Sequence, residues 1–367
     1  FMRLVIDSQI PFMKGHAEQL GEVIYKPGAE IDAATVREAD ALIVRTRTRC
    51  DRKLLENSKV KFIASATIGF DHIDTAYLAE KGIAWTNCPG CNANSVAQYV
   101  ETALLQLAFH GWQGEGSVPT PVSAPFSVKK LHERFFADKC LAVVGVGHVG
   151  SRVVRMAQRL GFGEILLCDP PREEAEGSGD FVSLEEVTRR ADVITFHTPL
   201  TRKPTAHPTF HLADTAFFEK LRRRPVLINS SRGEVMETEA LKDALRHELL
   251  SAAVIDTWEN EPYVDRELLQ KVFIATPHIA GYSADGKANG TRMALSATAR
   301  FFGLDEKAFG LIAPPPLPKN YAYFPEGEGH QVSEALRRYD PAADHLRLLH
   351  QPELFEKWRG NYPLRRE

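Results

Sequence analysis

The sequence predicts an α/β protein with two doubly wound parallel sheets and a small additional segment at the C-terminus. Three observations lead to this fold class. Short β-branched runs alternate with amphipathic stretches, these runs fall into two series, and the second series opens with a glycine-rich turn. Such alternation of strand and helix favours parallel sheets that are covered by helices. With 367 residues, the chain is long enough for two or three domains.

The first series contains four apolar runs that we interpret as buried strands, at 3–7, 41–45, 61–67 and 82–87. A helical pattern over 75–82 lies between the last two of them. The second series contains six such runs, at 140–147, 164–169, 192–198, 225–231, 252–258 and 272–278. Helices are expected between these runs, at 149–161, 183–191 and 238–250. Six strands with intervening helices are the content of one complete dinucleotide-binding sheet.

Three further segments do not fit either series. The stretch 111–128 is rich in Gly, Pro and Ser, and we expect a loop or an insertion there. Residues 313–320 form a Pro-rich linker, which favours an extended chain. The tail from 321 to 367 carries aromatic and charged residues. It is expected to be a small extra domain or an arm that packs on a partner subunit.

Composition excludes several classes of partner. The chain is 44% hydrophobic and 25% charged, with a formal net charge of −3, so no global basic field attracts nucleic acid or an anionic membrane. The first residues have neither the pattern of a signal peptide nor that of a membrane span. Five scattered cysteines favour a reducing cytoplasm over a disulfide scaffold. Cys88 and Cys91 form a lone C-x-x-C, so we expect neither redox chemistry nor a metal site there.

The cofactor is indicated by the turn Gly145-Val146-Gly147-His148-Val149-Gly150, which lies between a predicted strand and a predicted helix. Gly145 permits a tight turn, Gly147 lets the backbone approach a pyrophosphate, and Gly150 lets the helix pack close to the strand. Free backbone N–H groups and the positive end of the helix dipole then face the phosphates. The context therefore predicts a dinucleotide cofactor, although a simple strand–turn–helix remains the alternative.

The acidic residue Asp169 favours NAD over NADP. It follows the next predicted strand, at the distance where a carboxylate binds the ribose hydroxyls, and its charge repels a 2′-phosphate. The alternative is an acidic loop residue without this role. Arg172 lies close by in sequence and is the one feature that weakens the preference for NAD.

Arg232, Glu261 and His278 are the candidate catalytic residues. Each lies at or just beyond the carboxyl end of a predicted strand, where open parallel sheets bind their ligands. Removal of hydride from a carbinol carbon needs a base for the hydroxyl proton, and histidine titrates in the useful range. A carboxylate orients such an imidazole, and an arginine grips a substrate carboxylate. Taken singly, each residue is better explained without a catalytic role: Arg232 as a helix cap or a partner of Glu234, Glu261 as a solvated loop charge, and His278 as a satisfied loop histidine.

Motifs in the same order extend this interpretation. The strings GVGHVG (145–150), HTPL (197–200), INSSRGE (228–234), DTWENEP (256–262) and TPHIAGYS (276–283) resemble the D-isomer-specific 2-hydroxyacid dehydrogenase family. The resemblance implies that Arg232, Glu261 and His278 are the catalytic set. It implies a Rossmann-like NAD domain over 106–281 and a flavodoxin-like, discontinuous substrate domain over 1–105 and 282–308. It also implies that 309–367 is a dimerisation segment, and hence a homodimer.

The resemblance also implies a substrate. Within the family, the chain is most similar to the branch that oxidises 4-phospho-D-erythronate. The motifs that carry this similarity are VIDSQIPF (5–12), VRTRT (44–48), SATIGFDHID (65–74), NCPGCNANSVAQYV (87–100), HIAGYS (278–283) and RGNYPLRRE (359–367). Two alternatives stay open, namely another hydroxy acid such as 3-phosphoglycerate and a non-catalytic NAD(H)-sensing interaction protein. The implied substrate contacts are Thr46, Thr67 and Tyr282, and the implied NAD contacts beyond the glycine turn are Thr198, Ser230, Ser231, Arg232, Asp256 and Gly281.

The substrate phosphate requires cations. Arg45, Arg47 and Arg49 alternate in sequence, and in an extended strand alternate side chains point to one face. Arg45 and Arg47 are therefore candidates for a phosphate clamp, with a solvated charged edge as the equal alternative. For Arg49 we favour the solvated edge.

Overall fold

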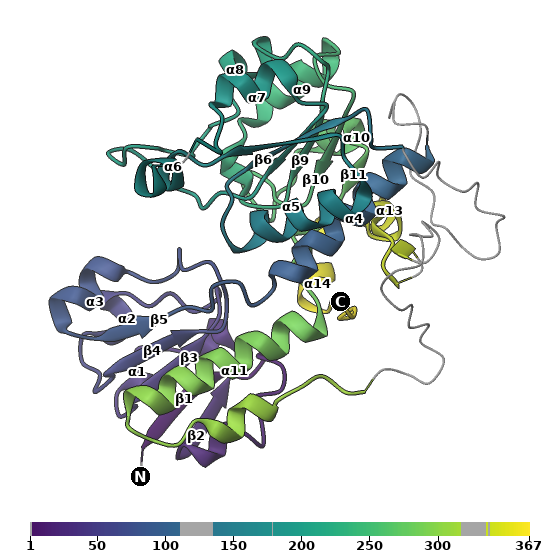
Figure 1. Ribbon diagram of the computed structural model, residues 1–367. Helices are drawn as coiled ribbons and strands as arrows, with labels where there is room; N and C mark the ends of the chain where they lie inside the picture. The colour runs from purple at the N-terminus through teal and green to yellow at the C-terminus, as the bar shows by residue number, and fades with distance from the viewer. Residues whose placement is uncertain (1, 111–134, 178, 317–334, 337) are drawn as a thin grey trace. The chain divides into compact units, whose positions relative to one another are not determined.

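The computed structural model describes residues 2–110, 135–177, 179–316, 335–336 and 338–367. The chain divides into two compact units, shown in Figure 1. Unit 1 comprises 1–92, 282–323 and 366–367, and unit 2 comprises 93–281 and 324–365. The described part of the C-terminal tail is thus shared between both units. The boundaries inferred from the family resemblance and the dimerising role of 309–367 stay predictions, and the predicted insertion at 111–131 lies outside the described residues.

Unit 1 is built on one parallel sheet of five strands, in the order β2-β1-β3-β4-β5. The strands are β1 (Arg3–Asp7), β2 (Glu22–Lys26), β3 (Ala41–Val44), β4 (Phe62–Ser65) and β5 (Ala84–Thr86). The helices are α1 (Ala33–Val36), α2 (Arg52–Leu55), α3 (Thr75–Lys81) and α11 (Ala284–Phe301), with the 3-10 turns η1 (Ala17–Gln19), η2 (Gly28–Glu30) and η4 (Lys307–Leu311). The strand order reverses between β1 and β3, and sheets of this type bind ligands outside the carboxyl ends at that point.

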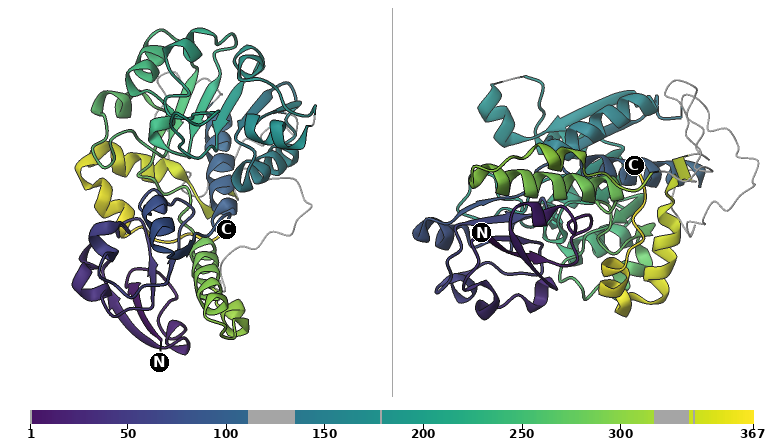
Figure 2. Two further views of the ribbon diagram at one scale, coloured as in Figure 1. Left: turned by 90° about the vertical axis from the view of Figure 1, so that its left-hand side faces the viewer. Right: turned by 90° about the horizontal axis from the view of Figure 1, so that it is seen from below.

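Both faces of this sheet are covered, as the alternation of its side chains requires. Leu4 and Ile6 pack in one apolar cluster with Leu295 of α11. Val5, between them in sequence, packs in a second cluster with Leu78 of α3. Figures 1 and 2 show α11 running along one face of the sheet. Strand β2 was not predicted; it is an edge strand whose three apolar residues, at 23–25, lie between the charged Glu22 and Lys26.

Unit 2 contains a parallel sheet of six strands, in the order β11-β10-β9-β8-β6-β7. The strands are β6 (Cys140–Val144), β7 (Glu164–Cys168), β8 (Val193–Phe196), β9 (Val226–Asn229), β10 (Ala252–Ile255) and β11 (Ile274–Ala275). Each coincides with one of the six predicted runs, so the α/β fold class with two parallel sheets is confirmed. The strands end earlier than predicted at their carboxyl ends, where the chain turns into the loops that carry the candidate site.

Five helices of unit 2 begin at a side chain that accepts a hydrogen bond from one of the first free amides. Asp169, Ser183, Asp214, Asp265 and Asp340 are such caps. The helices are α4 (Ala93–Phe109), α5 (His148–Leu160), α6 (Pro170–Glu176), α7 (Leu184–Arg190), α8 (Thr215–Glu219), α9 (Thr238–Arg246), α10 (Arg266–Lys271), α13 (Pro341–His350) and α14 (Phe355–Gly360). Two 3-10 turns, η3 (Gly233–Val235) and η5 (Pro352–Leu354), complete the unit.

The C-terminal helices belong to the core of unit 2. Leu348 of α13 and Phe355 at the start of α14 are almost fully buried, and both lie in the apolar cluster that covers one face of the six-stranded sheet. Figure 1 shows α13 beside β11 and α4. The tail therefore approaches the carboxyl end of β11, which leads directly to His278. None of the helices in the described ranges has the length and apolar character needed to cross a membrane.

Candidate active site

The glycine turn has the geometry of a phosphate cradle. A Cβ on Gly145, whose φ is +88°, would lie 2.8 Å from the carbonyl carbon of His197, and one on Gly150 would lie 2.0 Å from the Gly145 oxygen. Neither position can accept a side chain. Gly147 is the N-cap of α5 and has nothing within 4 Å of the place a Cβ would occupy. The start of α5 is therefore open, with its free amides available to an anion.

Asp169 ties this turn to the end of β7. Its Oδ2 accepts a hydrogen bond from the Val146 amide at 2.7 Å, and its Oδ1 caps α6 through the Arg172 amide at 3.1 Å. The carboxylate retains acceptor capacity for ribose hydroxyls. Arg172 is paired with Glu176 at 2.6 Å and donates to the Val146 carbonyl at 2.6 Å. Because this cation is already neutralised, the site favours NAD over NADP.

Among the buried hydroxyls of the described residues that have no hydrogen-bond partner are Thr198 Oγ1 and Ser230 Oγ. They follow β8 and β9, and both were expected to contact NAD. Buried polar atoms normally find partners, so these two indicate a polar ligand. Ser231 differs, since its hydroxyl donates to Asn229 Oδ1 at 2.8 Å. Together with the open helix start, the orphaned hydroxyls show that these residues fit a dinucleotide.

His278 and Glu261 form a hydrogen-bonded pair. Nδ1 of the imidazole lies 2.9 Å from Oε2 of the carboxylate, and the Trp258 amide donates to Oε1 at 2.9 Å. His278 has a left-handed backbone, with φ of +56°, which turns the chain sharply after β11. Since an ionised carboxylate only accepts, Nδ1 carries the proton and Nε2 is left as the free base. This is the arrangement that proton abstraction requires.

The Glu261 carboxylate is stabilised in its charged form. Burial opposes its ionisation, but His278, the hydrogen bond to it, Arg359 and the Trp258 amide outweigh burial and hold the pKa of Glu261 below its usual value. Arg359 Nη1 lies 3.8 Å from Glu261 Oε2. The sequence analysis missed Arg359, because it lies in the C-terminal tail and only the packing of α14 on unit 2 brings it to the carboxylate.

Asp256 holds the loop that carries His278. Its Oδ1 accepts hydrogen bonds from Thr276 Oγ1 at 2.6 Å and from the Ile279 amide at 2.8 Å, and its Oδ2 accepts from the Ala280 amide at 3.0 Å. Burial raises the pKa of Asp256, although His278, the Thr276 hydroxyl and the two amides favour its charged form. Asp256 was expected to contact NAD, and in the structure it also orders the segment up to Gly281.

Arg232 follows β9, the strand adjacent to β10, and its Nη1 donates to the Ser231 carbonyl at 2.8 Å. The next residue shows how closely the two loops approach. A Cβ on Gly233 would lie only 2.0 Å from the carbonyl carbon of Trp258, whose amide binds Glu261. The sheet therefore brings the loops of Arg232, Glu261 and His278 to its carboxyl edge within unit 2.

The expected substrate contacts belong to unit 1, and one argument for them was wrong. Strand β3 ends at Val44 and the chain then turns, so Arg45, Arg47 and Arg49 do not alternate along a strand. Arg45 instead donates to the buried carboxylate of Asp7 at 2.9 Å and to Gln9 at 2.7 Å. The identity of the phosphate ligands stays a prediction.

The remaining unit 1 candidates lie as follows. Thr46 is exposed, in the same turn as Arg47. Thr67 Oγ1 donates to the Gly69 carbonyl at 2.9 Å and lies 2.6 Å from Ser65 Oγ, which contacts the imidazole of His72 at 3.0 Å. The ring of Tyr282 lies under the Lys287 ammonium, at 3.9 Å. Arg45, Thr46 and Thr67 thus follow the carboxyl ends of β3 and β4.

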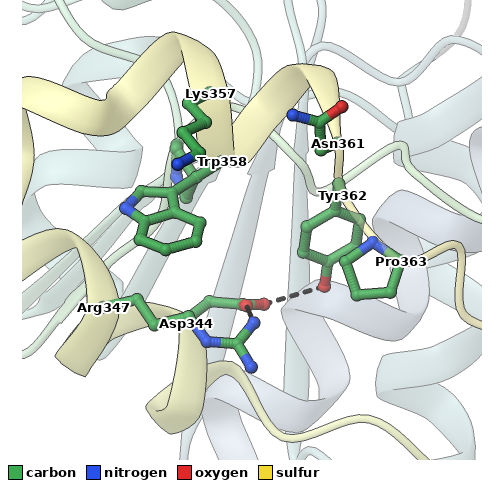
Figure 3. Close-up of a pocket in the computed structure, with 8 residues that line it drawn as sticks. Asp344, Arg347, Lys357, Trp358, Asn361, Tyr362 and Pro363 are labelled. Atoms are coloured by element: carbon green, nitrogen blue, oxygen red, sulfur yellow. Dashed lines mark hydrogen bonds and ion pairs between the residues drawn. The ribbon is translucent and has the colours of Figure 1, made fainter.

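Two other features of the described residues do not belong to the site. A pocket of about 380 Å³ between α13 and α14, shown in Figure 3, is lined by none of the predicted site residues. Cys88 and Cys91 are buried thiols; burial raises the pKa of Cys91 to about 11 and that of Cys88 further. In the described parts of the chain, no group of three or more His, Cys, Asp or Glu could hold a metal ion.

Comparison with known proteins identifies the family. Residues 121–280 match the model of the D-isomer specific 2-hydroxyacid dehydrogenase NAD binding domain. A protein of Bacteroides thetaiotaomicron named erythronate-4-phosphate dehydrogenase is 50% identical over 368 aligned residues, which cover 100% of this chain and 97% of that protein. The chain belongs to the D-isomer-specific 2-hydroxyacid dehydrogenase family. The motif resemblance is thereby confirmed.

Two solved structures share the fold of this chain. A D-lactate dehydrogenase from Aquifex aeolicus, complexed with NAD and lactic acid, matches with a TM-score of 0.63 and 24% identity over 85% of this chain and 99% of that one. A 3-phosphoglycerate dehydrogenase from Entamoeba histolytica with bound NAD⁺ matches with a TM-score of 0.64 and 23% identity, over 85% and 98% of the two chains.

Proposed function

We propose that this chain oxidises 4-phospho-D-erythronate to 3-hydroxy-2-oxo-4-phosphooxybutanoate with NAD, a step in pyridoxal 5′-phosphate biosynthesis. The observation that carries the proposal is the 2.9 Å bond between His278 and the ionised Glu261, which leaves Nε2 as a base. The choice of substrate is supported by the 50% identity to a protein named for that activity.

The roles of the residues in unit 2 follow from their chemistry. His278 Nε2 takes the proton of the C2 hydroxyl, and Glu261 stabilises the imidazolium that forms. Arg232 binds the substrate carboxylate and stabilises charge on the C2 oxygen as the carbonyl forms. NAD, when bound, supplies the acceptor for the hydride that leaves C2. Its binding is assigned to Gly145, Gly147, His148, Val149, Gly150, Asp169, Thr198, Ser230, Ser231, Arg232, Asp256 and Gly281.

In unit 1, we assign substrate contacts to Arg45, Thr46, Arg47, Thr67 and Tyr282. The support is that four of them follow strands β3 and β4, and β3 lies at the point where the order of the sheet reverses. Arg45 is held rigidly by Asp7 and Gln9, so its remaining N–H groups are preorganised for an anion. The position of Arg47 in the following turn places a second cation nearby in sequence.

We further propose that the chain works as a homodimer in the cytoplasm. All five cysteines are free thiols, which suits a reducing compartment. The dimer is inferred from the family resemblance of residues 309–367. Light scattering on the purified protein tests this point, and a monomer at micromolar concentration would contradict it.

The function is tested by NADH absorbance with 4-phospho-D-erythronate, 3-phosphoglycerate and D-lactate, each with NAD and with NADP, followed by mass spectrometry of the product. We expect turnover with the first substrate and NAD, and a loss of about a thousandfold or more in His278→Ala. If the protein oxidises 3-phosphoglycerate faster than 4-phospho-D-erythronate, 3-phosphoglycerate replaces it as the proposed substrate. NADH binding without turnover of any 2-hydroxy acid would favour a sensor.

A further inference from the structure

We propose that Arg359, on the C-terminal helix α14, is a positioning residue of the active site that holds the Glu261 carboxylate and tunes the pH range in which His278 acts as a base. This inference rests on the proposed function, because it assigns His278 the role of base. It gives the C-terminal segment a part in the chemistry of its own chain, separate from the dimerisation expected for 309–367.

The geometry places one carboxylate oxygen close to both the His278 imidazole and the Arg359 guanidinium. Glu261 Oε2 is 2.9 Å from Nδ1 of His278 and 3.8 Å from Nη1 of Arg359. The side chains of Glu261 and Arg359 are only 19% and 18% exposed. Because water reaches both groups poorly, their interaction is screened less than that of an ion pair on the open surface.

The tail is anchored on both sides of Arg359, so the backbone that carries this guanidinium is held in place. Before it, Phe355 is buried in the apolar cluster of unit 2. After it, the buried guanidinium of Arg365 donates to the carbonyls of Ile279 and Ala280, the two residues that follow His278. Arg365 also binds Gln98 and Ser95 of α4 and stacks on the Tyr339 ring at 4.1 Å. The same tail segment thus contacts both the loop of Glu261 and the loop of His278.

The charges around the pair decide the sign of the effect. Glu261 favours the imidazolium form of His278, and so does the negative charge of Asp256 beneath the loop. Arg359 disfavours the imidazolium form of His278, since one cation close to the pair disfavours the formation of a second cation there. Glu356 on α14 lies 3.9 Å from Arg359 and partly offsets that cation. Lys357, on the same helix, lines the pocket of Figure 3.

Removing the Arg359 charge should therefore raise the pH at which the base is lost. We expect Arg359→Gln to move the acid limb of kcat/KM upward by about half a pH unit, the size typical of a partly sheltered ion pair. Arg359→Lys should retain the wild-type limb, because it keeps the charge. Glu356→Gln should move the limb slightly the other way, since it removes the group that offsets Arg359. Lys357→Gln is the matched control, and its limb should not move.

The experiment measures these profiles together with the titration of the His278 imidazole by NMR in the resting protein. The NMR midpoint needs no turnover, so it tests Arg359 even if the wild type oxidises no hydroxy acid and the proposed function fails. An upward shift in Arg359→Gln alone supports the inference. An unmoved midpoint, or an equal shift in Lys357→Gln, overturns it. If Arg359→Gln does not fold, Glu356→Gln decides, and an upward or absent shift in that variant overturns the inference.

Discussion

Replacement of Glu261 by Gln tests the central pair most sharply, because the structure fixes how the amide must orient. The Trp258 amide donates to Oε1 at 2.9 Å, so the new side chain keeps its oxygen there. Its NH₂ group then takes the position of Oε2, opposite Nδ1 of His278. Two donors cannot face each other, and the imidazole must move its proton from Nδ1 to Nε2. In the favoured tautomer Nε2 then carries the proton, so it cannot act as the base.

The magnitude follows from two contributions. Forcing the productive tautomer against the amide costs about 1–3 kcal/mol, the cost of an unmade buried hydrogen bond, and lowers the plateau of kcat/KM about 5- to 150-fold. Loss of a hydrogen bond to a charged acceptor, about 1.5–3 kcal/mol, destabilises the imidazolium. The acid limb of kcat/KM should therefore move down by about one to two pH units.

The assay is initial-rate formation of NADH over the pH range, with Glu259→Gln as the control. Glu259 lies in the same loop and loses the same charge, but it pairs with His211 at 2.6 Å and binds Thr238, not His278. The control should keep both the plateau and the limb. A Glu261→Gln enzyme with a limb in the wild-type position and a rate within about twofold of wild type would refute the reasoning.

Four further changes test other parts of the structure. Gly233→Ala places a Cβ 2.0 Å from the Trp258 backbone, so urea unfolding should show that the free energy of unfolding falls by about 2–4 kcal/mol. Gly147→Ala places its Cβ in open space, so the free energy of unfolding should stay within about 1 kcal/mol of wild type while NADH binds about tenfold or more weakly. An unchanged affinity for NADH would count against the phosphate cradle. Asp169→Ala should raise KM for NAD about tenfold and improve the ratio of NADP to NAD turnover, while an unchanged ratio would remove Asp169 from ribose recognition. Burial lowers the pKa of His72 from 6.5 to about 4, so between these two pH values the folded state binds fewer protons than the unfolded state. At most about 3 kcal/mol of the free energy of unfolding is therefore present above the unfolded pKa of His72 and lost as the pH falls from 6.5 to about 4. His72→Gln should flatten this pH dependence of stability, whereas the exposed His247→Gln should not, and equal slopes in the two variants would contradict the prediction.

Most of the fold was predictable because its signals are local. Six strands of unit 2 and four of unit 1 appear as short apolar runs, since strands buried on both faces need apolar side chains at nearly every position. Edge strand β2 has only three apolar residues between Glu22 and Lys26 and was missed. The alternation assumed for Arg45 and Arg47 failed because the chain turns after Val44, and the sequence does not mark that turn with Gly or Pro.

The sequence by itself determined the fold class, the glycine turn with Asp169, and the candidates Arg232, Glu261 and His278, because each rests on residue types at short, fixed spacings from a strand end. Only the tertiary structure decided which atoms meet. It paired Nδ1 of His278 with Glu261, tied Arg45 to Asp7, and brought the C-terminal Arg359 to the catalytic carboxylate. The reason is that contacts between distant segments depend on how helices and loops pack, and that packing is set by the whole core and not by any local pattern.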